Sequence, residues 1–337
     1  MKRNPKYNWL WSLTILLLLL AIAIVISLST GDMKVSVLDI PRILKTGRDS
    51  MEYTVLFDIR MPRIILAIAV GGSLSLSGAI LQGIYRNPLV EPYTLGISGG
   101  AALGVALTIV LGLTKIIGST IMPISGFIGA LLVIVLLYFL SLSQGRIKVQ
   151  AMLLTGVMIS FITSSAILLL MSVTSTENLH GIIFWIMGSL DEPEYGLIHI
   201  VLWTSIIGMI VAFLFSQPLN ALRLGEEKAR HLGINTDVSV RILFLLSSIL
   251  TGVAVSVAGV IGFVGLIIPH LMRILFGNDY RSLLINSYIG GAAFLVMCDA
   301  IARVIIAPNE LPIGVITGII GGTVFVVLLA KSNLKKI

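Results

Sequence analysis

The chain has 337 residues, of which 57% are hydrophobic and 12% charged, with a mean hydropathy of +1.04. A globular core cannot bury this much apolar surface, so the composition indicates a polytopic membrane protein in contact with lipid rather than a soluble enzyme domain. The net charge of +7 comes from lysines and arginines scattered singly between apolar segments, which argues against a nucleic-acid partner. The apolar runs are continuous rather than alternating, so we expect an all-α fold.

Ten segments have the length and composition of membrane-spanning helices. The first follows Lys2, Arg3 and Lys6 as a signal peptide would, but its apolar run is long for a signal, so we expect a retained helix. After it, residues 34–50 ("KVSVLDIPRILKTGRDS") predict an interfacial amphipathic helix. The predicted spans are 9–29, 62–84, 93–113, 117–140, 151–173, 196–216, 241–258, 260–276, 284–306 and 312–330.

The distribution of positive charge predicts the orientation of these spans. An even number of spans places both termini on one side of the membrane. With the termini in the cytoplasm, fifteen of the 23 lysines and arginines lie on the cytoplasmic side, and six of the other eight lie in residues 34–63. We therefore expect a multi-pass protein of the cell (plasma or inner) membrane with both termini cytoplasmic.

Two stretches of similar sequence lie in opposite halves of the chain. They are "SGAILQGIYRNP" (77–88) and "AGVIGFVGLIIP" (258–269). The first begins in a span running inward and the second in a span running outward, so they predict an inverted-topology repeat. The alternative is that glycine, alanine and leucine recur in any membrane protein.

The sequence lacks the usual signatures of a membrane enzyme. Asp299 and Arg303, spaced i, i+4 near the end of the ninth span, suit either a structural ion pair or a proton relay. No H-E-x-x-H or P-loop sequence occurs, so any ATPase is a separate polypeptide. The four histidines lack ligand-like spacing, and Cys298 is the only cysteine. We expect no catalytic residue, no cofactor and no dedicated metal site.

The longest cytoplasmic connection, residues 216–241, contains the polar segment "LGEEKARHLG" (224–233). Glu226 with Arg230 and Glu227 with His231 have the i, i+4 spacing that supports a short helix. Gly233 is a natural helix stop. A helix this short is marginal in isolation, so either a partner docks on the segment or the segment is a solvated loop.

Five stretches of the chain carry a resemblance to a known family. The chain resembles the permease subunits of binding-protein-dependent ABC importers for iron-siderophores, haem and cobalamin, the FecCD or BtuC-like family. The resemblance covers almost the whole chain after residue 55 and is not specific to one substrate. The stretches are "RMPRIILAIAVGGSLSLSGAILQGIYRNPLVEPYTLGISGGAALG" (60–104), "FWIMGSL" (184–190), "LGEEKARHLGI" (224–234), "GVIGFVGLIIPHLMRILFGNDYRSLL" (259–284) and "DAIARVIIAPNELPIGVITGIIGG" (299–322).

The resemblance implies ten spans per subunit, a homodimer around a central path, two cytoplasmic ATPase subunits and an extracytoplasmic substrate-binding protein. It also implies that the 216–241 connection transmits ATP-driven closure to the spans. The residues expected to contact the ATPase are Leu224, Gly225, Glu226, Glu227, Arg230, Leu232 and Gly233.

The resemblance further implies that Arg60, Arg63 and Arg303 dock acidic residues of the binding protein, for which a guanidinium fork is well suited. Lipid-phosphate anchoring or pairing with Asp299 are the alternatives.

The fifth span is expected to line the translocation path, with a gate near its start. The expected path and gate residues are Val149, Gln150, Met152, Thr155 and Met158. Val149 and Gln150 differ from the small hydroxyl residues of some relatives, and the methionines are also ordinary membrane-helix fillers. An iron-siderophore is the leading substrate, with haem or cobalamin as the alternative. An ion-gradient-driven secondary transporter and a membrane-embedded enzyme are the other classes.

Overall fold

The computed structural model describes residues 5–31, 33, 36–47, 50–143, 146–192, 194–306 and 309–334. Within these ranges, seven helices are long and apolar enough to cross a membrane, and three shorter apolar helices accompany them. The seven are α1 (Pro5–Ser29), α4 (Met61–Tyr85, continuing the helical turns from Met51), α7 (Ile121–Ser141), α8 (Val149–Val173), α10 (Tyr195–Leu214), α13 (Thr236–Ala258) and α15 (Tyr280–Ala302). The shorter three are α5 (Ile97–Val110), α14 (Val264–Phe276) and the part Ile313–Leu328 of α16 (Ile313–Leu334).

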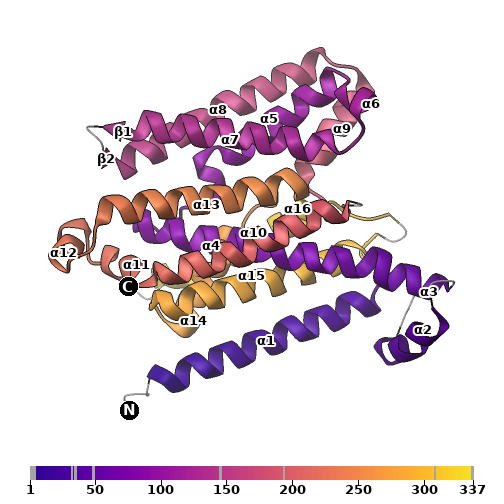
Figure 1. Cartoon of the computed structure of the whole chain (residues 1–337), viewed down its shortest axis with the longest axis horizontal. Coiled ribbons are helices and arrows are strands. Elements are labelled where there is room, and N and C mark those ends of the chain that lie inside the picture. Colours follow the sequence, from indigo (N-terminus) through magenta and orange to yellow (C-terminus); the bar gives the residue numbers. More distant parts are fainter. Residues whose placement is uncertain are drawn as a thin grey trace.

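Short elements connect the long helices at the two ends of the molecule. One end carries α11 (Ser216–Leu222), α12 (Glu226–His231) and the hairpin of β1 (Leu142–Ser143) and β2 (Arg146–Ile147); we call it the α12 end (Figure 1). The opposite end, the α2 end, carries η1 (Val37–Asp39), α2 (Ile40–Thr46), α3 (Met51–Tyr53), η2 (Thr54–Arg60), α6 (Leu113–Ile117) and α9 (Thr176–Met187). The remaining short element is η3 (Pro92–Leu95).

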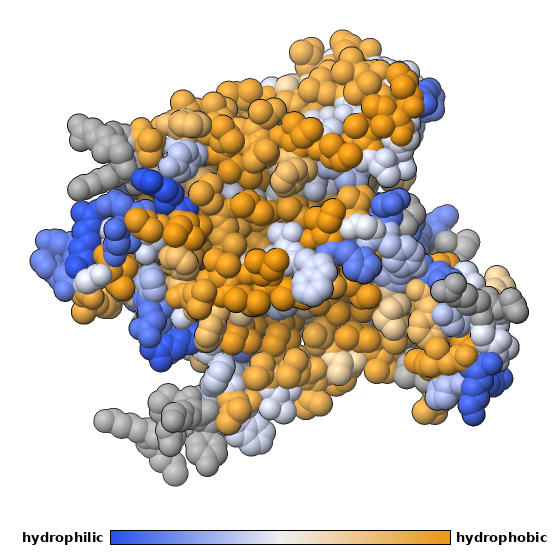
Figure 2. Space-filling view, viewed as in Figure 1, coloured by the Kyte–Doolittle hydropathy of each residue, from blue (hydrophilic) through white to orange (hydrophobic). Residues whose placement is uncertain are grey.

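A broad apolar belt covers the middle of the molecule, and hydrophilic residues gather at both ends (Figure 2). Large exposed hydrophobic side chains such as Leu132, Phe161 and Trp203 belong to this belt. A soluble protein would bury such side chains, whereas lipid tails solvate them. The chain is therefore an all-helical polytopic membrane protein, apart from the small hairpin, with its long helices running between the two ends.

Small residues allow the helices to pack closely. Helix α4 is central and packs on α10, α13, α14 and α15. Gly78 and Gly71 of α4 lie so close to the main chain of Gly265 and Gly291 that an added Cβ at either position would overlap a carbonyl oxygen. Such backbone approach is the usual basis of helix association in lipid, where burial of apolar side chains adds little driving force.

Two non-helical stretches meet inside the bundle. One follows Arg86, where φ is 51° and α4 ends, and leads into η3, which carries Tyr93. The other is residues 259–263 between α13 and α14. The Tyr93 hydroxyl joins them because it donates to Ile261 O at 2.7 Å and accepts from Ile261 N at 3.0 Å. Irregular backbone is tolerated at such depth only when its polar groups are satisfied by protein.

Helix α1 lies along α15 and makes polar contacts at each of its ends. At the α12 end, the buried Asn286 amide donates to Ser12 Oγ at 3.2 Å. At the α2 end, carbonyl oxygens of its last turn accept from Arg60 and Arg303. The last four carbonyls of a helix have no intrahelical donor, so these side chains satisfy otherwise unpaired groups.

The structure differs from the predicted elements at several places. The segment predicted as 62–84 is part of a continuous 35-residue helical stretch, Met51–Tyr85. The segment predicted as 93–113 contains the 14-residue α5, roughly 21 Å long, because η3 and the preceding residues use the rest of the segment. In the predicted interfacial helix, residues 37–46 form η1 and α2, whereas residues 34, 35, 48 and 49 lie outside the described ranges. The inverted repeat stays a prediction.

Candidate functional site

The predicted short helix in the polar segment is confirmed as α12. Gly225 before it has φ of 108° and Gly233 after it has φ of 82°, values that favour glycine. Ala229 is the buried contact that holds α12 to the body, while Leu224 and Leu232 on either side are exposed. Two exposed leucines at the polar end of a membrane protein indicate a surface that another protein can cover.

Arg230 does not pair with Glu226 as the i, i+4 spacing predicts. Its Nε donates to Thr236 Oγ1 at 2.8 Å, and its Nη2 lies 3.4 Å from Asp237 Oδ1. The tight turn at Gly233 brings the first turn of α13 beside α12, where the hydroxyl and carboxylate together attract the guanidinium more strongly than one exposed glutamate. Arg230 therefore ties α12 to α13, and Glu226 stays exposed at the start of α12, where the helix dipole favours an acid.

At the α2 end, two of the three predicted arginines, Arg63 and Arg303, share one buried aspartate. Asp299 Oδ1 accepts from Arg63 Nε at 2.7 Å, and Asp299 Oδ2 lies 3.1 Å from Arg303 Nε. The structural ion pair expected from the spacing of Asp299 and Arg303 is thus confirmed. Arg63 also pairs with Glu310 at 2.7 Å, and the Glu310 side chain is 48% exposed. A buried charge needs a partner and hydrogen bonds, and this cluster supplies both.

The cluster extends to the end of α1. Arg303 Nη2 donates to Ser27 O at 3.1 Å and to Ser27 Oγ at 2.6 Å, and its Nη1 donates to Thr30 O at 3.3 Å. Arg60 donates to the carbonyl oxygens of Leu28 and Met33. All three arginines are buried with partners inside the chain, so docking by any of them remains a prediction that requires an exchange of partners.

Helix α8 has one buried and one exposed face. Its buried stripe runs from Met152 through Gly156 and Thr163, packed on η3 and α5. Met152 is completely buried because its helical phase matches Gly156 and not the exposed side, and its place on the path stays a prediction. Met158 and Gln150 lie on the exposed side, and Val149 and Thr155 are half-buried beside them.

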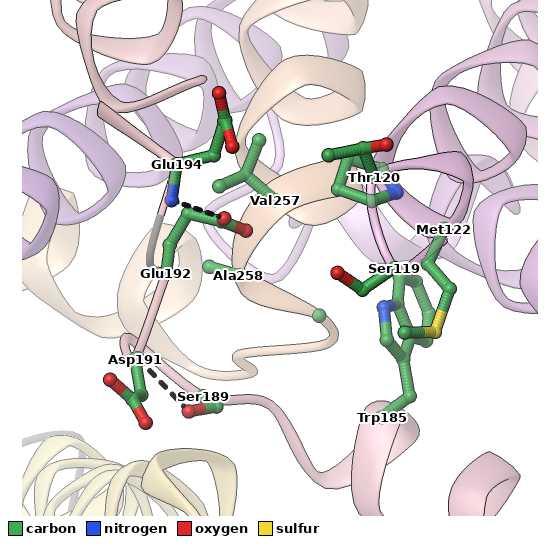
Figure 3. Close-up of a pocket in the computed structure, with 12 residues that line it drawn as sticks. Ser119, Thr120, Met122, Trp185, Ser189, Asp191, Glu192, Glu194, Val257 and Ala258 are labelled. Atoms are coloured by element: carbon green, nitrogen blue, oxygen red, sulfur yellow. Dashed lines mark hydrogen bonds between the residues drawn. The ribbon is translucent and has the colours of Figure 1, made fainter. Parts of the chain in front are cut away.

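A pocket of about 250 Å³ at the α2 end was not predicted (Figure 3). It lies between the α6–α7 turn, the α9–α10 connection and the last turn of α13, with Trp185 on its wall. Glu192 accepts a hydrogen bond from Glu194 N at 2.9 Å, and Asp191 N donates to Ser189 at 3.0 Å. Burial, with the carboxylates of Glu194 and Asp191 nearby, raises the pKa of Glu192. The acid-rich "DEPE" at 191–194 was the signal in the sequence.

Comparison with known proteins places this architecture among transporters. The FecCD transport family model matches residues 19–331. The hemin transport system permease protein HmuU of Yersinia pestis is 36% identical over 91% of this chain and 92% of its own length. The cobalamin import system permease protein BtuC of Halobacterium salinarum is 36% identical over 87% of this chain and 78% of its own length.

A solved structure shows the same fold. It is described as an inward-facing conformation of an ABC transporter of the metal-chelate type, and it superposes with a TM-score of 0.83 at 33% identity. The similarity covers 96% of this chain and 99% of that one. Since the family match spans nearly the whole bundle, including α12 and the arginine cluster, the chain belongs to the FecCD transport family, as a permease subunit of an ABC transporter and not a catalytic subunit.

Proposed function

We propose that the protein is the permease subunit of an ABC importer for a metal chelate. The observation that carries this proposal is the near-complete structural match to a metal-chelate type ABC transporter. An iron-siderophore is the proposed substrate. Haem or cobalamin is the second candidate, favoured by the similarity to the hemin and cobalamin permeases. No chemistry on the substrate is involved, because alternating access needs only a change in which side of the path is open.

We further propose ten spans, made of the seven long helices and the three shorter ones. The α12 end faces the cytoplasm, in keeping with the larger share of lysine and arginine assigned to that side. The exposed face of α8, with Met158 and Gln150, lines the path between two copies of the chain.

The function is tested by uptake into proteoliposomes that contain the permease and its ATPase, with the chelate-loaded binding protein added outside. Uptake should require ATP inside the vesicles and should stop when the ATPase is omitted. Uptake driven by an ion gradient alone, undiminished without the ATPase, would instead establish a secondary transporter.

We also propose that the ATPase docks on α12 and the residues beside it, which predicts a strong loss of transport when α12 is changed. The double substitution Glu226→Gln with Arg230→Gln should lower ATP-driven uptake by about tenfold and reduce co-purification of the ATPase, because contact residues at the centre of an interface carry most of its energy. Uptake and pull-down on the same preparations measure this.

Asp237→Asn is the matched control, because it removes the carboxylate partner of Arg230 and leaves both proposed contact residues in place. A loss equal to that of the double variant would show that Arg230 acts only by bracing α12. Normal uptake and co-purification in the double variant would remove the coupling assignment.

If the binding protein docks at the arginine cluster, one substitution in the permease should increase its affinity for the binding protein. The Glu310 carboxylate pairs with Nη1 of Arg63. A carboxylate of the binding protein would therefore have to displace Glu310 from this nitrogen. Glu310→Gln leaves the Asp299 pair intact and should tighten capture of the loaded binding protein by about two- to fivefold at low salt.

The control for docking is Glu52→Gln, which breaks the exposed ion pair with Arg42 at the same end and removes the same charge. Surface plasmon resonance with the permease in nanodiscs measures both. Unchanged or weaker capture by Glu310→Gln, or an equal gain in Glu52→Gln, would contradict the exchange at Arg63.

A further inference from the structure

A second pocket, at the α12 end, is strongly basic. It has a volume of about 310 Å³ and lies where the ends of α4, α11 and α14 meet. Arg86 comes from the end of α4, Arg223 follows α11, and Arg273 comes from the last turn of α14. Three guanidinium groups from three separate segments thus converge on one cavity.

The positive charge of this pocket has no counter-ion among the described residues. Across the part of the chain that the structure describes, no carboxylate forms an ion pair with Arg86, Arg223 or Arg273. Asp279, which lies between the lining residues Asn278 and Tyr280, is occupied by Asn220 Nδ2 at 2.7 Å and by a main-chain amide. Converging cations without a counter-ion raise the local potential and attract an anion.

A neutral side chain orients Arg273 and leaves its positive charge unpaired. Buried Gln82 donates to the carbonyl oxygens of Gly265 and Leu266, which turns its own Oε1 toward Arg273 Nη1 at 3.1 Å. His270 lines the same pocket, and its Nδ1 is shielded from solvent without a hydrogen-bond partner among the described residues. An oxyanion can accept from guanidinium groups and from a histidine N–H at once.

Exposed apolar side chains lie beside the pocket, which favours a ligand with both an anionic group and acyl chains over a free ion. Leu89, next to the lining residue Pro88, is 51% exposed. Ile274, on the same side of α14 as His270 because it is four residues later, is 57% exposed. We propose that this pocket binds the phosphate of an anionic phospholipid headgroup, with the acyl chains lying on these flanking side chains. The proposal rests on charge and geometry and is independent of the transported substrate.

The test is native mass spectrometry of the full-length permease titrated with phosphatidylglycerol, phosphatidylcholine or inorganic phosphate. We expect phosphatidylglycerol to bind at least tenfold more tightly than phosphatidylcholine. Arg86→Gln and Arg223→Gln should each weaken it by about fivefold. Both keep the Gln82–Arg273 contact, and thermal unfolding of each variant is measured to check that it folds. Arg281→Gln is the matched control, because it removes one exposed charge from the same end but lies outside the pocket.

Four results would overturn the proposal. Equal binding of the two lipids would exclude a headgroup site, and an equal loss in Arg281→Gln would reduce the effect to net charge. Tight binding of inorganic phosphate without any preference between lipids would assign the pocket to a soluble anion. Unchanged lipid binding in the pocket variants, with loss of ATPase co-purification, would assign it to a partner protein.

Discussion

Replacing Gly78 by alanine is expected to destabilise the protein by about 3 kcal/mol and to lower the yield of folded permease sharply. The new methyl group would overlap the carbonyl oxygen of Gly265, a main-chain atom that cannot rotate away. The approach is close from the other side as well, because a Cβ added at Gly265 would meet Leu74 O and the ring of Pro92. The unfolding temperature of the detergent-purified variant, with its yield, measures the effect.

Gly318→Ala in α16 provides the matched control, because no atom lies within 4 Å of the methyl group that it adds. In that variant alanine should be neutral or slightly stabilising, by about 0.5–1 kcal/mol, as expected for a helix interior. If the two variants unfold at the same temperature, the close approach of α4 and α14 is wrong.

The substitution Asp299→Asn is expected to cost about 3–5 kcal/mol, because it leaves Arg303 buried without a carboxylate and Arg63 with only the half-exposed Glu310. The shape of the side chain is nearly unchanged, so the loss reports charge rather than packing. Thermal unfolding and protease resistance of the purified variant measure it.

The comparison for this prediction is Glu52→Gln, which removes an exposed ion pair with Arg42 and should cost less than about 1 kcal/mol. Equal stability of Asp299→Asn and Glu52→Gln would mean that the arginine cluster is solvated and does not bear on folding.

Hydropathy located the lipid-facing helices well and the interior ones less well. The predicted 117–140 and 196–216 agree with α7 and α10 to within a few residues because both helices are apolar along their whole length. The start of the Met51–Tyr85 stretch was missed because Glu52 and Asp58 resemble loop residues, although the helix continues beyond the apolar belt to include them. The length of an apolar run therefore indicates how much of a helix lies in the apolar belt, and it does not indicate where the helix ends.

In the candidate sites, too, the sequence predicted local helices but not the contacts between distant residues. Local spacing predicted α12 and its glycine boundaries, but the partner of Arg230 lies seven residues away across a turn. The pairing of Arg63 with Asp299 joins residues 236 positions apart, so no local pattern could reveal it. The family resemblance pointed to the arginines, and only the fold shows that Arg63 and Arg303 share the carboxylate of Asp299.

The two polar attachments of α1 set its position along the neighbouring helix. Between them the contact with α15 is largely apolar, and in a bilayer such a surface gains little over the same surface in acyl chains. Sliding α1 by one residue would turn it by about 100° and shift it by about 1.5 Å, which would separate Ser12 from Asn286 and the last carbonyls from Arg303 together. Hydrophobicity therefore keeps α1 in the membrane, and a few hydrogen bonds at its two tips fix its register.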